Sequence, residues 1–190
     1  MMRIITGKAR GVRLATLEGE ATRPTSERAK EAVFSILQFE ISGRRVLDLF
    51  AGSGQLGLEA LSRGASSATF CDASRDAVRI IRTNAERTRL FPQCEIECRE
   101  WEALLRMRRG GEPYGLILLD PPYAMRVLPR VLETLLEYGL CTPDARIVCE
   151  SAAEGDVFCG DESLAARFEI LRAARYGAAY VTILSPKKEN

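Results

Sequence analysis

The chain has 190 residues, of which 46% are hydrophobic and 28% charged, a composition typical of one ordinary globular domain. Lysine and arginine number 27 against 26 aspartates and glutamates, and the formal net charge of +1 argues against a chain coated throughout with cations. The sequence contains no histidine, which excludes the serine triad, the Cys–His dyad and a histidine-ligated metal site, and we expect no metal. Any chemistry here must therefore proceed without imidazole.

The six cysteines include no Cys-x-x-Cys pair, and the chain opens without an apolar signal segment. Secreted disulfide scaffolds are usually shorter and richer in cysteine, so we expect a cytoplasmic protein whose cysteines are mostly buried thiols. No apolar run approaches the roughly 20 residues of a membrane span, and no membrane partner is expected.

The N-terminal residues 1–42 are predicted to form a basic extension. Residues 1–30 carry seven lysines and arginines against three glutamates, so the near-neutral total conceals a local excess of positive charge. Short β-prone pieces around Gly7 and Gly11 predict a β-hairpin. Apolar residues at 3.6-residue spacing then predict a helix over about 25–39.

From residue 43 onward, strand-like runs alternate with helical ones, which predicts a mostly parallel sheet with helices on both faces. The last two strand-like runs have no helix between them and predict an antiparallel hairpin at the sheet edge. The predicted strands are residues 44–50, 67–72, 94–98, 114–120, 145–150, 167–177 and 178–185, and the predicted helices are residues 54–63, 74–88, 100–107 and 125–138. The expected fold is α/β and Rossmann-like, with a seven-stranded sheet in residues 43–190 that forms one compact unit with the extension.

A glycine-rich turn follows the first of these strands, in the sequence VLDLFAGSG. In an open α/β sheet, a strand that ends in such a turn and opens a helix is where a nucleotide-like ligand binds. The run continues as Gly-x-Gly-x-x-Gly, and Asp72 follows Gly52 at the spacing of about 20 residues that the dinucleotide fingerprint requires. A carboxylate at that position accepts hydrogen bonds from ribose hydroxyls, whichever nucleoside cofactor is bound.

Asp48 lies four residues before Gly52. A dinucleotide places its pyrophosphate over the glycine turn, where an additional carboxylate would repel it. S-adenosylmethionine has no phosphate and carries an ammonium group and a sulfonium, both of which a carboxylate attracts. Asp48 therefore favours S-adenosylmethionine as the cofactor, and an NAD-dependent dehydrogenase is the rival interpretation.

The predicted strand over residues 114–120 leads into Asp120-Pro121-Pro122-Tyr123. Two consecutive prolines fix the backbone and remove two N–H donors, which leaves the Asp120 carboxylate and the Pro121 carbonyl as acceptors. The exocyclic amine of a flipped nucleobase offers two N–H donors, and Tyr123 can stack on its ring. The predicted reaction is in-line methyl transfer to that amine.

This reaction tolerates the absence of histidine. The sulfonium is already a good leaving group, and the amine becomes acidic only once its nitrogen carries the methyl group. Positioning and exclusion of water would supply most of the barrier reduction. Asp120 would either accept the proton or only orient the amine.

Four motifs together extend over most of the chain. They are Arg3-Ile4-Ile5 with Gly7 and Gly11, then TRPTSER, VLDLFAGSGQLGLEALSRGA and LLDPPY. In combination they resemble the RsmD-type 16S rRNA guanine-N2 methyltransferases. The resemblance implies a class I methyltransferase fold, S-adenosylmethionine as methyl donor, and methylation of the exocyclic N2 of one guanine. It also implies 16S rRNA or a small-subunit assembly particle as partner, and we expect a monomer.

The motifs and the resemblance together assign the candidate site residues. The catalytic group is Asp120, Pro121 and Tyr123. The cofactor-binding group is Asp48, Ala51, Gly52, Ser53, Gly54, Asp72, Ala73, Glu100 and Trp101. Members of the family usually place an acid and a small residue after the third strand, whereas this chain has Glu100 and Trp101. Glu100 is the expected adenine contact, and Trp101 either packs beside the ring or belongs to the core.

The basic extension acquires a role from the same resemblance. Its cations would contact RNA phosphates, and the start of the predicted helix would lie over the cofactor mouth. The substrate-binding group is Arg3, Lys8, Arg10, Arg13, Arg23, Thr25, Pro122 and Tyr123.

Other functions stay open on the sequence. Asp-Pro-Pro-Tyr also resembles the adenine-N6 methyltransferases of DNA or RNA, because its hydrogen-bond acceptors recognise an amine rather than a whole base. The chain has no evident target-recognition domain, which counts against a sequence-specific DNA enzyme. A methyltransferase acting on a protein amide and a non-enzymatic RNA-binding module are the further alternatives.

Overall fold

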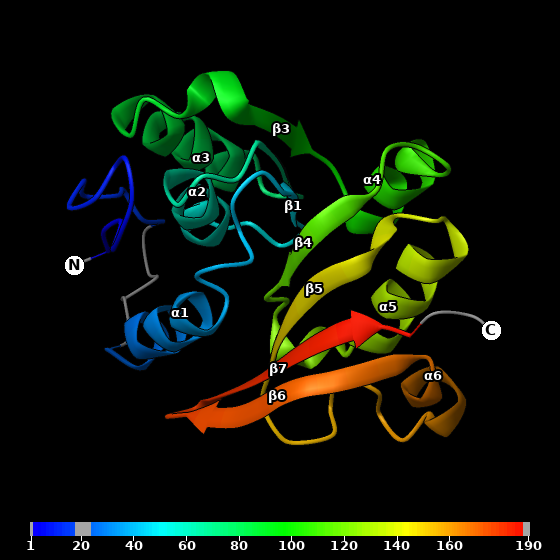
Figure 1. Cartoon of the computed structure of the whole chain (residues 1–190). Coiled ribbons are helices and arrows are strands. Elements are labelled where there is room, and N and C mark those ends of the chain that lie inside the picture. The colour runs from blue at the N-terminus through cyan, green and yellow to red at the C-terminus, as the bar shows by residue number, and fades with distance from the viewer. Residues whose placement is uncertain (1, 18–23, 188–190) are drawn as a thin grey trace.

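The structure is a computed structural model that describes residues 2–17 and 24–187 (Figure 1). Its helices are α1 (Pro24–Ile36), α2 (Gln55–Ser62), α3 (Arg75–Arg87), α4 (Trp101–Arg108), α5 (Leu128–Glu137) and α6 (Glu162–Ala166). Its strands are β1 (Arg45–Asp48), β2 (Ser67–Asp72), β3 (Cys94–Cys98), β4 (Tyr114–Leu119), β5 (Cys141–Ser151), β6 (Phe168–Tyr176) and β7 (Ala179–Pro186). Short 3₁₀ turns lie at Phe91–Gln93 and Tyr123–Met125.

The strands form one seven-stranded sheet in the order β3-β2-β1-β4-β5-β7-β6. Neighbours from β3 to β5 are parallel, whereas β7 runs antiparallel to both β5 and β6. The predicted Rossmann-like α/β fold with a C-terminal antiparallel hairpin is confirmed. The strand order reverses direction between β1 and β4, and ligands bind such sheets at this switch point.

Helices cover both faces of the sheet (Figure 1), and β4 shows how its residues divide between them. Leu116 and Leu118 are buried with residues of α1, α2 and α3, whereas Ile117 and Leu119 are buried with residues of α4 and α5. A strand buried on both faces consists of a continuous apolar run, as YGLILL does. Because side chains alternate along a strand, Asp120, which lies two positions beyond Leu118, is on the face of the sheet that α1 covers.

Several element boundaries differ from the prediction for local reasons. α1 ends at Ile36, earlier than predicted, and a turn follows it. α5 begins only at Leu128, because residues 123–125 form a separate 3₁₀ turn. α6 is absent from the prediction, since its five residues are too few to show helical periodicity. Asp161 caps this helix by accepting the N–H of Leu164.

The N-terminal arm, residues 2–17, is a compact hairpin rather than a pair of extended strands. An antiparallel bridge joins Arg3 to Arg13, while Ile4 and Leu14 are buried against the main core. The alternation leaves the cations outside and the apolar side chains inside, so the arm is a folded part of the molecule.

A buried carboxylate on α2 fastens this arm. Glu59 is 0% exposed, and its two oxygens accept the N–H groups of Ile5 at 2.7 Å and of Thr6 at 3.0 Å. Gly7 follows with φ of 89°, and a Cβ there would lie 1.8 Å from the carbonyl oxygen of Ser62. The close approach of the arm to α2 therefore requires glycine at this position.

The six cysteines are free thiols. Cys71 and Cys149 are buried and Cys94 and Cys141 half-buried, but Cys98 and Cys159 are exposed. The expectation of mostly buried thiols is therefore wrong for the last two residues. One of them ends the edge strand β3, and the other lies in the loop before α6.

Candidate active site

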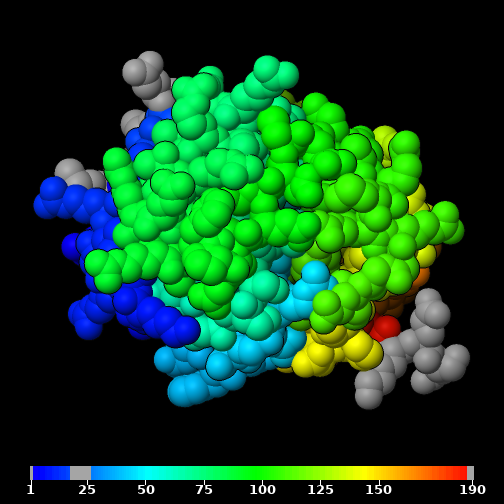
Figure 2. All heavy atoms as spheres, turned by 90° about the horizontal axis from the view of Figure 1, so that it is seen from above, coloured from blue at the N-terminus to red at the C-terminus, as the bar shows by residue number. Residues whose placement is uncertain are grey.

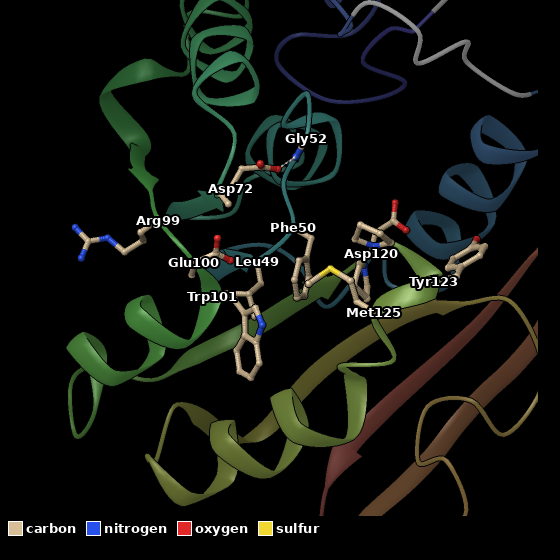
Figure 3. Close-up of a pocket in the computed structure, with 13 residues that line it drawn as sticks. Leu49, Phe50, Gly52, Asp72, Arg99, Glu100, Trp101, Asp120, Tyr123 and Met125 are labelled. Atoms are coloured by element: carbon tan, nitrogen blue, oxygen red, sulfur yellow. Dashed lines mark hydrogen bonds between the residues drawn. The ribbon is translucent and has the colours of Figure 1, made fainter.

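A cleft of about 470 Å³ opens beyond the carboxyl ends of β1, β2 and β4 (Figure 3). Four segments that are distant in the sequence meet there: the end of β1 with its glycine turn, the end of β2, the residues after β3 and the Asp-Pro-Pro-Tyr run. The residues that line it are Leu49, Phe50, Gly52, Asp72, Ala73, Arg99, Glu100, Trp101, Asp120, Pro121, Pro122, Tyr123 and Met125. The cleft thus lies at the switch point of the sheet.

Asp48 ends β1 and lies beneath the glycine turn, where it is 1% exposed. Its Oδ2 accepts the N–H of Gly57 at 2.9 Å. Burial, together with the nearby charge of Asp72, raises the pKa of Asp48 from 3.8 to about 7, and the Gly57 hydrogen bond opposes this rise. The carboxylate is not among the lining groups of the cleft, so its predicted role at the methionine end of the cofactor stays a prediction.

The glycine turn brings the backbone close to both the cofactor cleft and α3. Gly54 has φ of 76°, and a Cβ there would lie 3.3 Å from the side chain of Ile81. Ala51 and Ser53 are buried and, like Gly54, are not among the residues that line the cleft. Of the four residues predicted in this turn, Gly52 is the one that reaches the cleft surface.

Asp72 ends β2 and lies at the rim of the cleft (Figure 3). Its Oδ2 accepts the N–H of Gly52 at 2.9 Å, and its Oδ1 accepts the N–H of Ser74 at 2.9 Å. Because a carboxylate has about four acceptor positions, these two bonds fix its orientation and leave capacity for ribose hydroxyls. Ala73 lines the cleft beside it and is exposed.

Glu100 and Trp101 lie where β3 leads into α4, and both line the cleft. Glu100 is exposed, whereas Trp101 is only 4% exposed and packs in the same cluster as Leu104. Trp101 is therefore a core residue that also lines the cleft, and its packing beside the adenine ring stays a prediction. Arg99 also lines the cleft and pairs with Glu97 at 2.7 Å, and the sequence analysis did not predict this residue.

The Asp-Pro-Pro-Tyr run directly follows β4. Asp120 is half-buried, Pro121 is buried, and Tyr123 is 40% exposed. Asp120 and Tyr123 lie on the α1 side of the cleft, whereas Asp72 and Glu100 lie on the opposite side (Figure 3). The two groups of predicted residues therefore form opposite walls of the cleft. The wall with Asp72 and Glu100 is suited to a cofactor and is called the cofactor wall, and the wall with Asp120 and Tyr123 is suited to a substrate and is called the substrate wall.

Glu150 does not line the cleft itself but contacts the substrate wall, and sequence reasoning did not find it. The hydroxyl of Tyr123 donates to its Oε1 at 2.7 Å. Burial raises the pKa of Glu150, and the Tyr123 hydrogen bond opposes the rise. No motif marks Glu150, but its position at the end of the predicted strand over residues 145–150 could have indicated it.

The cations of the N-terminal arm are on the surface. Arg3, Lys8, Arg10 and Arg13 are exposed, and Figure 2 shows the arm at one edge of the molecule. Arg23 lies outside the described residues, and Thr25 belongs to the first turn of α1. The exposed cations are available for phosphates, and their predicted RNA contact stays a prediction.

A buried side-chain amide joins this arm to the glycine turn. Asn84 of α3 is 0% exposed; its Oδ1 accepts the N–H of Ala15 at 2.7 Å, and its Nδ2 donates to the carbonyls of Ala15 at 3.0 Å and Ser53 at 2.9 Å. Ser53 also donates from its hydroxyl to the sulfur of Met2 at 3.2 Å. The predicted cofactor residue Ser53 thus has a structural role in this junction.

The sheet order, the glycine turn and the acid after β2 define a class I methyltransferase fold. The structure superposes on the O-methyltransferase from Bacillus cereus, which was solved in complex with SAH, with a TM-score of 0.68 and 14% identity, covering 89% of this chain and 84% of that one. That likeness concerns the fold alone. The Escherichia coli protein yhhF is more similar, with a TM-score of 0.84 and 28% identity over 99% of both chains.

The family follows from the sequence matches. Residues 2–185 match the family model described as Conserved hypothetical protein 95. The chain is also 32% identical over 151 residues to the Haemophilus influenzae protein named Ribosomal RNA small subunit methyltransferase D, covering 79% of this chain and 78% of that protein. The chain therefore belongs to this family of RsmD-type methyltransferases, which confirms the resemblance and the predicted enzyme class. The dehydrogenase and the non-enzymatic RNA-binding module are set aside.

Among residues 2–17 and 24–187, no helix has the length and apolar character that crossing a bilayer requires. Within the same described part of the chain, no cluster of three or more acidic and cysteine side chains is placed to hold a metal ion.

Proposed function

We propose that this protein transfers the methyl group of S-adenosylmethionine to the exocyclic N2 amine of a guanine in small-subunit (16S) rRNA. The observation that carries the proposal is the position of Asp120 directly after β4, across the cleft from Asp72 (Figure 3), with Pro121 next to it in the lining of the cleft. One wall offers acceptors for a ribose, and the facing wall offers acceptors for an amine. The membership of the family supports rRNA as the substrate class.

The residues of the cofactor wall fit S-adenosylmethionine. Asp72 is oriented by two backbone N–H groups and has acceptor capacity left for the ribose. Asp48 is a carboxyl group buried beneath the turn, and a cationic ligand nearby would favour its ionised form, whereas a pyrophosphate there would oppose it. Glu100 and the edge of Trp101 would contact the adenine. When bound, S-adenosylmethionine supplies an electrophilic methyl group on a sulfonium.

The substrate wall would contribute to catalysis by positioning the target base and its amine. Asp120 and the Pro121 carbonyl would accept the two N–H bonds of the amine, which directs the nitrogen lone pair toward the cofactor wall. Tyr123 would stack on the flipped base, with its hydroxyl held by Glu150. Near-attack geometry and exclusion of water then account for most of the acceleration, and no imidazole is needed.

The direct test is methylation of unmethylated small-subunit particles and of naked 16S rRNA with radiolabelled S-adenosylmethionine, followed by nucleoside analysis. N2-methylguanosine is the expected product. N6-methyladenosine would favour the alternative, an adenine-N6 methyltransferase, whose amine the same two acceptors can hold. Absence of label from both RNA substrates would contradict the proposal. The proposal also includes that the enzyme is a monomer and, because ribosomal RNA is the substrate, that it is cytoplasmic.

Replacing Arg10 and Arg13 together with alanine is expected to weaken RNA binding and to flatten its salt dependence. Each phosphate contact contributes roughly 0.7 to 0.9 to the slope of log K against log salt, so the slope should fall by roughly 1.4 to 1.8 for the pair. Filter binding across a salt series, with calorimetry of S-adenosylhomocysteine, measures both affinities.

The matched control for this pair is Arg106→Ala with Arg172→Ala, two exposed arginines on α4 and β6. The control should leave the RNA slope unchanged. Lost S-adenosylhomocysteine binding in the Arg10 and Arg13 variant would instead show that the arm serves the fold of the cofactor site, and would contradict its role as an RNA contact.

A further inference from the structure

A second carboxylate, Glu150, lies beside Asp120 and behind the substrate wall. Leu119 of β4 pairs with Cys149 of β5 in parallel register, so Asp120 and Glu150 follow paired residues on neighbouring strands. Adjacent strands lie roughly 4.8 Å apart. The two acids are therefore neighbours at the same edge of the sheet.

Both acids also lie on the same face of that edge. Leu118 and Val148 precede them by two positions, and both are buried in the cluster that contains the α1 residues. Since side chains alternate along a strand, Asp120 and Glu150 continue the α1 face. Consistent with this, both line one hollow beneath α1, and Glu150 lines a second hollow with Tyr123.

The Tyr123 hydrogen bond prepares Glu150 for a further donor. The hydroxyl donates to Oε1 at 2.7 Å, which fixes the orientation of the carboxylate. A carboxylate has about four acceptor positions, so this bond leaves capacity for a ligand. Burial also makes an unmatched donor or acceptor opposite this group more costly than it would be in water.

Two neighbouring acceptors distinguish the purines by their Watson–Crick edges. Guanine presents the N2 amine beside an N1–H, so it offers donors at both positions. Adenine presents the N6 amine beside N1, which is an acceptor there. A carboxylate opposite that second position binds guanine and repels adenine.

We propose that Glu150 is a specificity-determining residue, whose carboxylate accepts the N1–H of the target guanine while Asp120 and Pro121 hold its N2 amine. This inference rests on the proposed function and deepens it, because Asp120 and Pro121 alone would accept either purine. Tyr123 has two tasks in this arrangement, since its ring stacks on the base and its hydroxyl orients the reading carboxylate.

The test uses Glu150→Gln with the full-length protein and two RNAs, one with the natural guanine and one with adenine at the same position. The amide retains an acceptor for Tyr123 and adds an N–H that suits adenine N1. We expect kcat/KM on the guanine RNA to fall by about tenfold or more, as for a buried donor that loses its charged acceptor. The guanine-to-adenine ratio should fall by at least the same factor.

Two further variants distinguish recognition of the base by Glu150 from a structural effect of Glu150 on the loop that contains Tyr123. Tyr123→Phe keeps the ring and the carboxylate but removes the hydrogen bond that orients the carboxylate, so it should lower kcat/KM and reduce the guanine-to-adenine ratio by less than Glu150→Gln does. Glu169→Gln changes an exposed carboxylate on β6 and should alter neither quantity. S-adenosylhomocysteine affinity, measured by calorimetry, should stay unchanged in all three variants.

The outcomes distinguish the two proposals. If Glu150→Gln leaves the ratio intact, whether or not overall activity falls, Glu150 does not read the base and the inference is overturned. The same holds if Tyr123→Phe lowers the ratio as much as Glu150→Gln does. If the wild-type protein makes no N2-methylguanosine at all, the proposed function itself fails.

Discussion

Replacing Asp120 with alanine is expected to lower kcat for RNA methylation by roughly 10²- to 10³-fold, the loss typical of removing one preorganised polar contact to a reacting group. The side chain lies on the substrate wall, across the cleft from Asp72 (Figure 3). S-adenosylhomocysteine affinity should therefore change little. Single-turnover kinetics with calorimetry on the same preparation measures both quantities, and an equal loss of cofactor affinity would place Asp120 in the cofactor site.

Asp120→Asn separates the two roles that the carboxylate could have. The amide retains one acceptor for the amine but cannot take its proton as a carboxylate does. Since the amine becomes acidic only after methylation, we expect this variant to retain most of the activity that Asp120→Ala loses. An asparagine variant as inactive as the alanine variant would show that proton acceptance is required.

Asp48→Asn is expected to stabilise the protein without cofactor at pH 8, by roughly 2 to 4 kcal/mol. The carboxyl has a pKa of about 7 in the fold against an ordinary value of 3.8, so the folded state binds the extra proton between these values. This contribution to stability therefore falls as the pH rises through about 7. The amide keeps an acceptor for the N–H of Gly57 and avoids the buried charge.

Urea unfolding at pH 4.5 and pH 8 tests this, with Asp76→Asn as the control. Asp76 is an exposed carboxylate in the first turn of α3 and should show no such effect. The free energy of unfolding of the Asp48 variant should differ from that of the wild type mainly at the higher pH. S-adenosylmethionine should also bind the variant more weakly, because the buried negative charge is lost. An equal difference at both pH values would show that charge is not the cause.

The order of strands and helices was predictable because each element of the sheet shows its own periodicity. YGLILL is apolar without interruption, as a strand buried on both faces must be, and the glycine turn after β1 marks the ligand edge. The short helix α6 and the late start of α5 were not predictable. They depend on single caps and on a 3₁₀ turn, which leave little periodic signal.

Residues that lie in local motifs were predictable for a physical reason. Gly52 and Asp72 lie in a local motif, whose spacing follows from one strand-turn-helix unit. Glu150 belongs to no motif and lies next to Asp120 and Tyr123 only through the pairing of β5 with β4. Likewise, Glu59 and Asn84 look like surface residues in a helix, and only the folded arm above them explains why they are buried.

Asn84 links the N-terminal arm and the glycine turn through one buried side chain. Its side chain bonds Ala15 on one side and Ser53 on the other, so a shift of either segment strains the same three hydrogen bonds. Ligands that tighten the turn would then also order the arm, and by thermodynamic reciprocity RNA held on the arm would raise the affinity for the methyl donor by the same factor. The enzyme could in this way keep its donor preferentially when a substrate is present.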